Sequence, residues 1–167
     1  LARRIAFWFA ARLGSSYNGL LLALIAADFA LTFIIPSGIA RVAILGAVVV
    51  RLAEALGLTR DDPRARGLML AVTCAASIFD KMVLAGTSSI LAAGIIERLG
   101  GVRVSYGLWF LAFMPCDVLT IVGCWRLIAW LYPDRQRSLG DSRAHSTAVL
   151  STMGPLSARE RRAALLV

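Results

Sequence analysis

The chain has 167 residues, of which 59% are hydrophobic, and its mean hydropathy is +0.75. That apolar share exceeds the roughly 45–50% of an ordinary soluble domain, so the composition argues against a typical soluble protein and predicts a membrane protein. The net charge of +8 arises from 18 basic residues, all of them arginine except Lys81. Because the arginines stand between apolar runs and form no polar face interleaved with aromatic residues, we expect no nucleic-acid partner and interpret them as topology determinants.

Residues 1–13 form the first apolar segment, in which aromatic residues stand beside Arg3, Arg4 and Arg12. This mixture is typical of the end of a spanning helix or of a helix that lies in the membrane interface. The chain starts with Leu1, and no charged n-region, apolar core and small-residue cleavage site mark a signal peptide. We therefore expect the chain to be a fragment of a longer protein.

The segment from about 19 to 57 consists of two apolar arms separated by Pro36-Ser37-Gly38, which cannot readily continue a regular helix. Each uninterrupted arm is shorter than the about 20 apolar residues that a full crossing requires. Both flanks, around Arg12 and at 60–66, are basic, and the positive-inside bias places both on the cytoplasmic side. We therefore predict a re-entrant helical hairpin over about 19–57, with its tip at membrane depth.

The next apolar stretch, about 67–96, is interrupted near its middle by Asp80-Lys81 and by residues 85–89. A helix that breaks inside the bilayer leaves backbone amides and carbonyls unpaired, which is tolerated only where protein or an aqueous cavity covers them. We therefore predict a discontinuous helix with a binding site at its break.

Residues 105–132 are the clearest span, with Trp109 near one end and Trp125 and Trp130 towards the other, as expected for aromatic belts. Residues 1–133 are thus predicted to form an all-α, multi-pass transmembrane unit of the cell (inner) membrane. After Pro133 the chain becomes charged and rich in serine. We interpret 134–167 as a cytoplasmic linker that leads to a missing second half.

Two predicted helix starts could bind a small anion. Ser37-Gly38 precede the second hairpin arm, and Thr87-Ser88 precede the second half of the broken helix. Both offer hydroxyl caps and free backbone N–H groups at the positive end of a helix dipole, while unwound carbonyls nearby can coordinate a cation. The alternative is that these are kinks whose hydroxyls bond to their own backbone.

Arg41 is the fifth candidate for anion binding. It lies in the first turn of the second hairpin arm, where the helix dipole and the apolar surroundings both disfavour a cation, so an acidic partner is required. That partner is either the substrate anion or Asp28 on the first arm. Asp80 and Lys81 either pair with each other or face the cavity, and Asp117 is a weaker candidate.

The sequence offers little for other chemistry. Cys74, Cys116 and Cys124 lie inside apolar segments without metal-ligand spacing, and the single histidine, His145, lies in the polar tail. No Walker, GxSxG, HExxH or GxGxxG motif is present. We therefore expect no enzyme, no disulfide, no metal other than a coupling sodium ion and no cofactor.

Four segments resemble, in order, the first half of the divalent anion:sodium symporters, and the resemblance covers nearly the whole chain. These segments are Leu1-Ala2-Arg3-Arg4-Ile5-Ala6, residues 33–41 from Phe33 to Arg41, residues 86–94 from Gly86 to Gly94, and Ser105-Tyr106-Gly107-Leu108-Trp109 with Pro115. The family includes bacterial carriers of dicarboxylates, citrate and sulfate. The resemblance implies one half of an inverted-repeat transporter, with the second half of the same protein and a homodimer as its partners.

The resemblance also implies site residues. In the family a re-entrant hairpin and an unwound helix form a sodium site and part of the anion site, which here carries over to Ser37, Gly86, Thr87 and Ser88. The family's hairpin tip typically reads Ser-Asn-Thr, where this chain has Ser37-Gly38-Ile39. The unwound loop often reads Gly-Thr followed by Pro-Asn, where this chain has Ser89 and Ile90 in the latter two places.

The sequence thus predicts a secondary active transporter for small anions such as dicarboxylates, citrate or sulfate. Sodium or protons would be the coupling ion, with Ser37, Gly86 and Thr87 as the sodium-binding candidates. Two alternatives stay open. One is a membrane structural or assembly protein whose broken helices are only kinks. The other is an intramembrane enzyme that uses Asp80 and Lys81.

Overall fold

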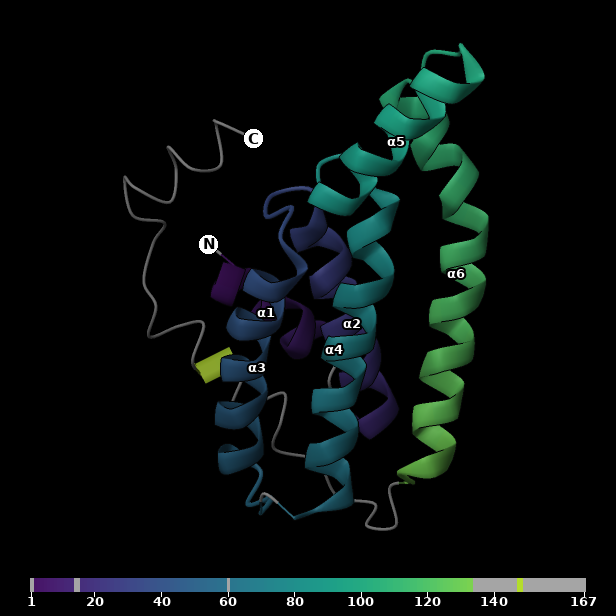
Figure 1. Ribbon diagram of the computed structural model, residues 1–167. Coiled ribbons are helices and arrows are strands. Elements are labelled where there is room, and N and C mark those ends of the chain that lie inside the picture. Colours follow the sequence, from purple (N-terminus) through teal and green to yellow (C-terminus); the bar gives the residue numbers. More distant parts are fainter. Residues whose placement is uncertain (1, 14–15, 60, 134–146, 149–167) are drawn as a thin grey trace, which may run out of the picture.

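The computed structural model of the chain is all-α in the part that it describes, which confirms the predicted class. The described residues are 2–13, 16–59, 61–133 and 147–148. Within them lie six helices and no strand (Figure 1). The helices are α1 (Ala2–Leu13), α2 (Tyr17–Thr32), α3 (Gly38–Ala55), α4 (Pro63–Met82), α5 (Thr87–Gly100) and α6 (Tyr106–Leu131). Most of the predicted linker, 134–167, lies outside the described residues.

The helix starts follow from local capping chemistry. Four helices begin after a residue whose side chain accepts a hydrogen bond from a backbone N–H of the first turn, which satisfies one of the unpaired amides there. These N-cap residues are Ser16 for α2, Ser37 for α3, Asp62 for α4 and Ser105 for α6. Helix α5 differs, because Gly86 precedes it and provides no side-chain cap.

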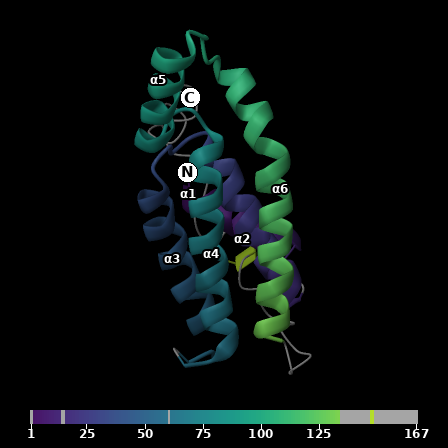
Figure 2. The same cartoon turned by 45° about the vertical axis from the view of Figure 1, so that its right-hand side comes forward.

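Helix α4 is the central element, since it packs against α2, α3 and α6, and α1 covers α2 (Figures 1 and 2). One core cluster unites α1 to α4 through buried side chains such as Phe7, Tyr17, Leu45 and Leu68. A second cluster, which includes Phe79, joins α2, α4 and α6. The C-terminal part of α4 is therefore packed against both α2 and α6.

Small residues allow this close packing. Gly67, Ala71 and Ala75 recur every fourth position on α4, and all three are buried. A Cβ atom at Gly67 would collide with the Tyr17 hydroxyl. Small residues at such spacing let neighbouring backbones approach, which is how helices associate where lipid removes the hydrophobic driving force.

The helices differ in length in a way that matters for a membrane. Among the described helices, only α6 is both long and apolar enough to cross a bilayer, with 26 residues and a mean hydropathy of 1.7 over its most apolar window. Helix α2 is apolar but has only 16 residues. Helix α5 and the start of α6 extend beyond the ends of α1 and α3 in Figure 1. The junction between α4 and α5 therefore lies part-way along the long axis of the molecule.

Candidate functional site

The two interruptions predicted from the sequence lie against each other. Residues 33–37 separate α2 from α3, and residues 83–86 separate α4 from α5. The predicted bounds were partly wrong, because Gly38, Asp80-Lys81 and residues 87–89 are helical. Between the two interruptions is a cavity of about 340 Å³, which we call the tip cavity. Its lining residues are Pro36, Ser37, Gly38, Ile39, Asp80, Ala85, Gly86 and Ser88. Four residues predicted for the site thus share one cavity.

Gly38 allows the hairpin tip to approach α4. Its backbone N–H donates a hydrogen bond of 2.9 Å to Asp80 Oδ1. A Cβ atom at this position would lie 3.0 Å from that oxygen and 3.3 Å from the backbone oxygen of Ala76. Only glycine fits here without displacing a neighbour. The hydroxyl of Ser37 accepts from Ala40 N at 3.4 Å, which is a long bond.

Arg41 is fully buried, and its guanidinium group forms three hydrogen bonds to protein groups. Its Nε donates to Asp28 Oδ1 at 3.1 Å, its Nη1 to the backbone oxygen of Ile35 at 3.0 Å and its Nη2 to that of Ala76 at 3.0 Å. Of the two partners considered from the sequence, Arg41 thus contacts Asp28, and it does not line the tip cavity. It ties α2, the tip and α4 together.

The sequence left open whether Asp80 and Lys81 pair with each other or face the cavity. The structure distinguishes these two arrangements. Asp80 lines the tip cavity, whereas its neighbour Lys81 turns to α6 and lies 3.2 Å from Asp117 Oδ1. This is an ionic contact only, because neither oxygen of the buried Asp117 has a partner with hydrogen-bond geometry. The two adjacent charged residues of α4 therefore face different surroundings, Asp80 the tip cavity and Lys81 helix α6.

The break between α4 and α5 is extended at both Val83 and Gly86. The backbone oxygen of Lys81, freed by the break, accepts from Trp109 Nε1 at 2.9 Å and from Ser89 Oγ at 3.4 Å. Sequence reasoning missed Trp109 in this role, since it counted the ring as part of an aromatic belt. The side chain of Thr87 lies outside the described part of the structure, and its backbone begins α5.

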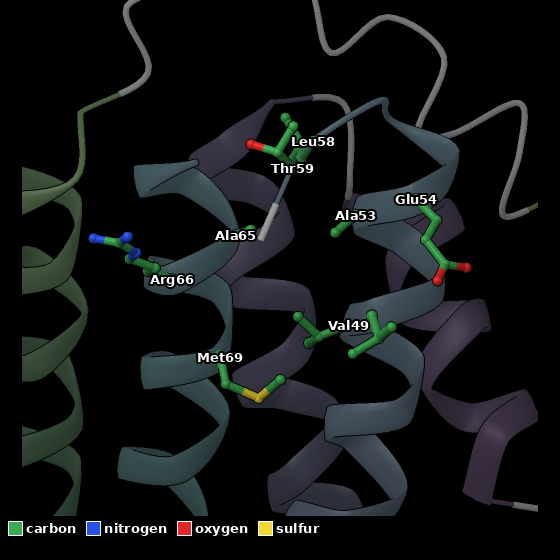
Figure 3. A pocket seen from close by; sticks show the side chains of 9 residues that line it. Val49, Ala53, Glu54, Leu58, Thr59, Ala65, Arg66 and Met69 are labelled. Atoms are coloured by element: carbon green, nitrogen blue, oxygen red, sulfur yellow. The ribbon is translucent and has the colours of Figure 1, made fainter. Parts of the chain in front are cut away.

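Two further cavities help to delimit the site. One, of about 620 Å³, lies beside the tip cavity and shares Gly38, Ile39 and Asp80 with it. The other, of about 490 Å³, lies at the opposite ends of α3 and α4, where Val49 and Met69 face each other across the space (Figure 3). It contains none of the residues predicted from the sequence to bind a ligand.

The family model described as "Sodium:sulfate symporter transmembrane region" matches residues 1–167. The chain belongs to this family. The resemblance noted from the sequence is thereby confirmed. Because the sodium:sulfate symporter family is one of membrane transporters, the match also agrees with the expectation of a protein that is not an enzyme.

Individual relatives agree with the family. The chain is 28% identical to a protein named "Membrane protein" from Cupriavidus necator, over 98% of the chain and 32% of that protein. It is 27% identical to the L-tartrate/succinate antiporter of Shigella dysenteriae, over 97% of the chain and 34% of the relative. It is 26% identical to the citrate/succinate antiporter of Escherichia coli, over 96% and 34%. The chain therefore spans about a third of the length of the curated relatives that it matches.

Proposed function

We propose that the chain is part of a secondary transporter that carries a small anion, a dicarboxylate, citrate or sulfate, across the cell (inner) membrane. The observation that carries this proposal is the meeting of two backbone interruptions, at 33–37 and 83–86, in one cavity. Irregular backbone at membrane depth is characteristic of substrate sites in transporters, since it is otherwise excluded from lipid.

The chemistry of the tip cavity supports an anion. Helices α3 and α5 both begin there, so two positive dipole ends and the hydroxyls of Ser37 and Ser88 lie at the same space. Its volume of about 340 Å³ lies at the lower end of the range that small-molecule sites occupy, which suits a ligand of a few heavy atoms. Arg41 donates a hydrogen bond to the backbone oxygen of Ile35 and thereby positions the hairpin tip beside the cavity.

The helix lengths support a re-entrant arrangement. Helices α2 and α3 are about 24 and 27 Å long at about 1.5 Å per residue, short of the about 30 Å hydrocarbon core, whereas α6 reaches about 39 Å. We place α2 and α3 as a hairpin that enters from the cytoplasmic side, and α4 with α5 as one discontinuous crossing. The second half of the protein then completes the inverted repeat, and lipid or a second protomer covers the apolar side chains that α6 exposes, such as Leu108, Leu111 and Leu119.

The proposed coupling is to a cation. Family membership supports sodium at Ser37, Gly86 and Thr87, and a proton is the competing choice. Straight helices at 36–38 and 85–89 would favour the structural-protein alternative, but the backbone is not helical at 33–37 or at 83–86. The enzyme alternative requires Asp80 and Lys81 to act together, but they face different neighbours.

The test is uptake into proteoliposomes that contain the protein as its gene encodes it. Radiolabelled succinate, citrate and sulfate are supplied with and without a sodium gradient. Ser37→Ala and Ser88→Ala should each reduce uptake of the transported anion severalfold, because a hydroxyl at each helix start is lost. The control is Thr120→Ala, an exposed residue of α6 whose hydroxyl bonds to Cys116 O in its own helix. Unchanged uptake in both serine variants contradicts the site.

A further inference from the structure

Asp80 places a carboxylate in the cavity proposed for an anion. It lies in the last turn of α4, is only partly buried, and lines both the tip cavity and the adjacent cavity of about 620 Å³. Its Oδ1 accepts the N–H of Gly38, the first residue of α3, at 2.9 Å. An acidic side chain from a separate helix therefore already occupies the backbone donor that the transported anion would use.

This contact is not ordinary helix capping. The N-cap residue of α3 is Ser37, whose own side chain bonds to Ala40 N, whereas Asp80 reaches the tip from 42 residues further along the chain. A charged acceptor forms a stronger bond to an N–H than a neutral one does. In its ionised form Asp80 thus holds the tip amide and repels an anion that approaches the cavity.

The neighbouring charges do not neutralise Asp80. On α3, Arg41 directs its donors to Asp28 and to two backbone oxygens. On α4, Lys81 is paired with Asp117 of α6. On α2, the charged residue of this region is Asp28, an acid, which accepts from Arg41.

The remaining neighbour brings no counter-charge either. Helix α5 carries no charged residue before Glu97, ten positions into the helix. Among the described residues, none forms an ion pair with Asp80. The N–H of Gly38 at the start of α3 is thus the partner of this carboxylate in the described part of the chain, which leaves it free to bind a proton.

We infer that Asp80 is the proton-binding residue of the transporter. When Asp80 takes up one proton on its carboxylate, its oxygen becomes a weaker acceptor, the Gly38 N–H is released, and the anion takes that hydrogen bond. Deprotonation on the other side of the membrane restores the bond between Asp80 and the tip and expels the anion. One proton and one anion are then carried together. This inference rests on the proposed function and specifies its coupling ion.

The experiment uses the protein as its gene encodes it, in sodium-free proteoliposomes, with radiolabelled succinate as the probe. Three quantities are measured: succinate exchange at equal pH, succinate accumulation under an inward proton gradient of one pH unit, and internal acidification reported by trapped pyranine. The wild type should exchange, accumulate up to about tenfold per coupled proton, and acidify the interior. For Asp80→Asn, accumulation and acidification are expressed relative to the variant's own exchange rate at equal pH, and both ratios should fall to background.

The asparagine variant keeps the size of Asp80 but is neutral and cannot bind a proton, so it resembles the protonated state. Asp80→Glu should restore at least part of the gradient-driven accumulation. Asp61→Asn serves as the matched control, because Asp61 is an exposed carboxylate ahead of the start of α4 that pairs with Arg66. It should behave as the wild type does.

Several results would overturn the inference. Accumulation by Asp80→Asn equal to that of the wild type places the proton elsewhere, for example on succinate itself. Loss of exchange in a correctly folded Asp80→Asn protein makes Asp80 a positioning residue only. If that variant does not fold, the wild type decides alone, since exchange without acidification contradicts proton coupling but leaves the proposed function intact. No exchange of succinate, citrate or sulfate by the wild type refutes both.

Discussion

Replacement of Arg41 by glutamine tests the buried link beneath the hairpin tip. The substitution removes the ion pair to Asp28 and the bonds to the oxygens of Ile35 and Ala76. Asp28 is fully buried and its second oxygen already lacks a hydrogen-bond partner, so the variant leaves an uncompensated charge inside the protein. Loss of one partner of a buried pair costs roughly 3–5 kcal/mol. We expect a large fall in the thermal midpoint of the purified protein.

The matched control is Arg51→Gln. Arg51 also pairs with a carboxylate, Glu54, at 3.0 Å, but both side chains are mostly exposed, at 71% and 58%. An exposed pair is worth about 0–1 kcal/mol, so the midpoint should hardly change. The double variant Arg41→Gln, Asp28→Asn should recover part of the lost stability, since it removes the unpaired charge.

The assay is thermal unfolding in detergent with transport measured on the same preparations. If Arg41 instead binds the anion directly, Arg41→Gln would abolish transport without lowering the midpoint, and Asp28→Asn would leave transport unchanged. That pair of results would refute the positioning role assigned to Arg41.

Three further predictions concern the tip and the surroundings of α4. Gly38→Ala should raise the KM for anion uptake severalfold, because the added Cβ would lie 3.0 Å from Asp80 Oδ1 and push the tip from α4; an unchanged KM contradicts this contact. Gly67→Val should lower the thermal midpoint, because overpacking against Tyr17 costs about 1–3 kcal/mol of stability. A midpoint equal to that of the wild type would disprove this. The side-chain hydrogen bond from Arg64 lowers the pKa of Asp62 below its usual 3.8. The stabilisation by this N-cap is therefore present above pH 3.8, and it is lost as the pH falls through the lower pKa of the folded state. Melting curves of Asp62→Asn and wild type should therefore differ at pH 6 and converge as the pH falls below 3.8; a constant difference contradicts the prediction.

Much of the helix pattern follows from local sequence chemistry. Pro36 lacks a backbone N–H, and Ser37 is a good N-cap, so a helix end and a helix start on either side of the tip can be predicted from these residues alone. In the structure, α2 ends at Thr32 and α3 begins at Gly38. The long apolar run after Ser105 likewise forms α6.

The side-chain partners at the site could not be predicted in the same way. Whether Arg41 contacts Asp28 or a substrate depends on how α2 and α3 rotate against each other, which hydrophobic spacing does not fix. The bond from Gly38 to Asp80 joins residues 42 positions apart, and it forms only because α4 ends beside the tip. Such contacts are set by packing of the whole bundle, so sequence reasoning could name Asp80 but not place it.

The most direct test of the central claim is substrate protection of cysteines placed at the tip and at the break. Cys74, Cys116 and Cys124 are free thiols and are first replaced by serine or alanine. Ser37→Cys and Ser88→Cys are then labelled separately with a charged methanethiosulfonate reagent in proteoliposomes. The account predicts that succinate, citrate or sulfate slows labelling at both positions, because one anion occupies the cavity that they share. Labelling at the same rate with and without every anion, at both positions, would contradict it.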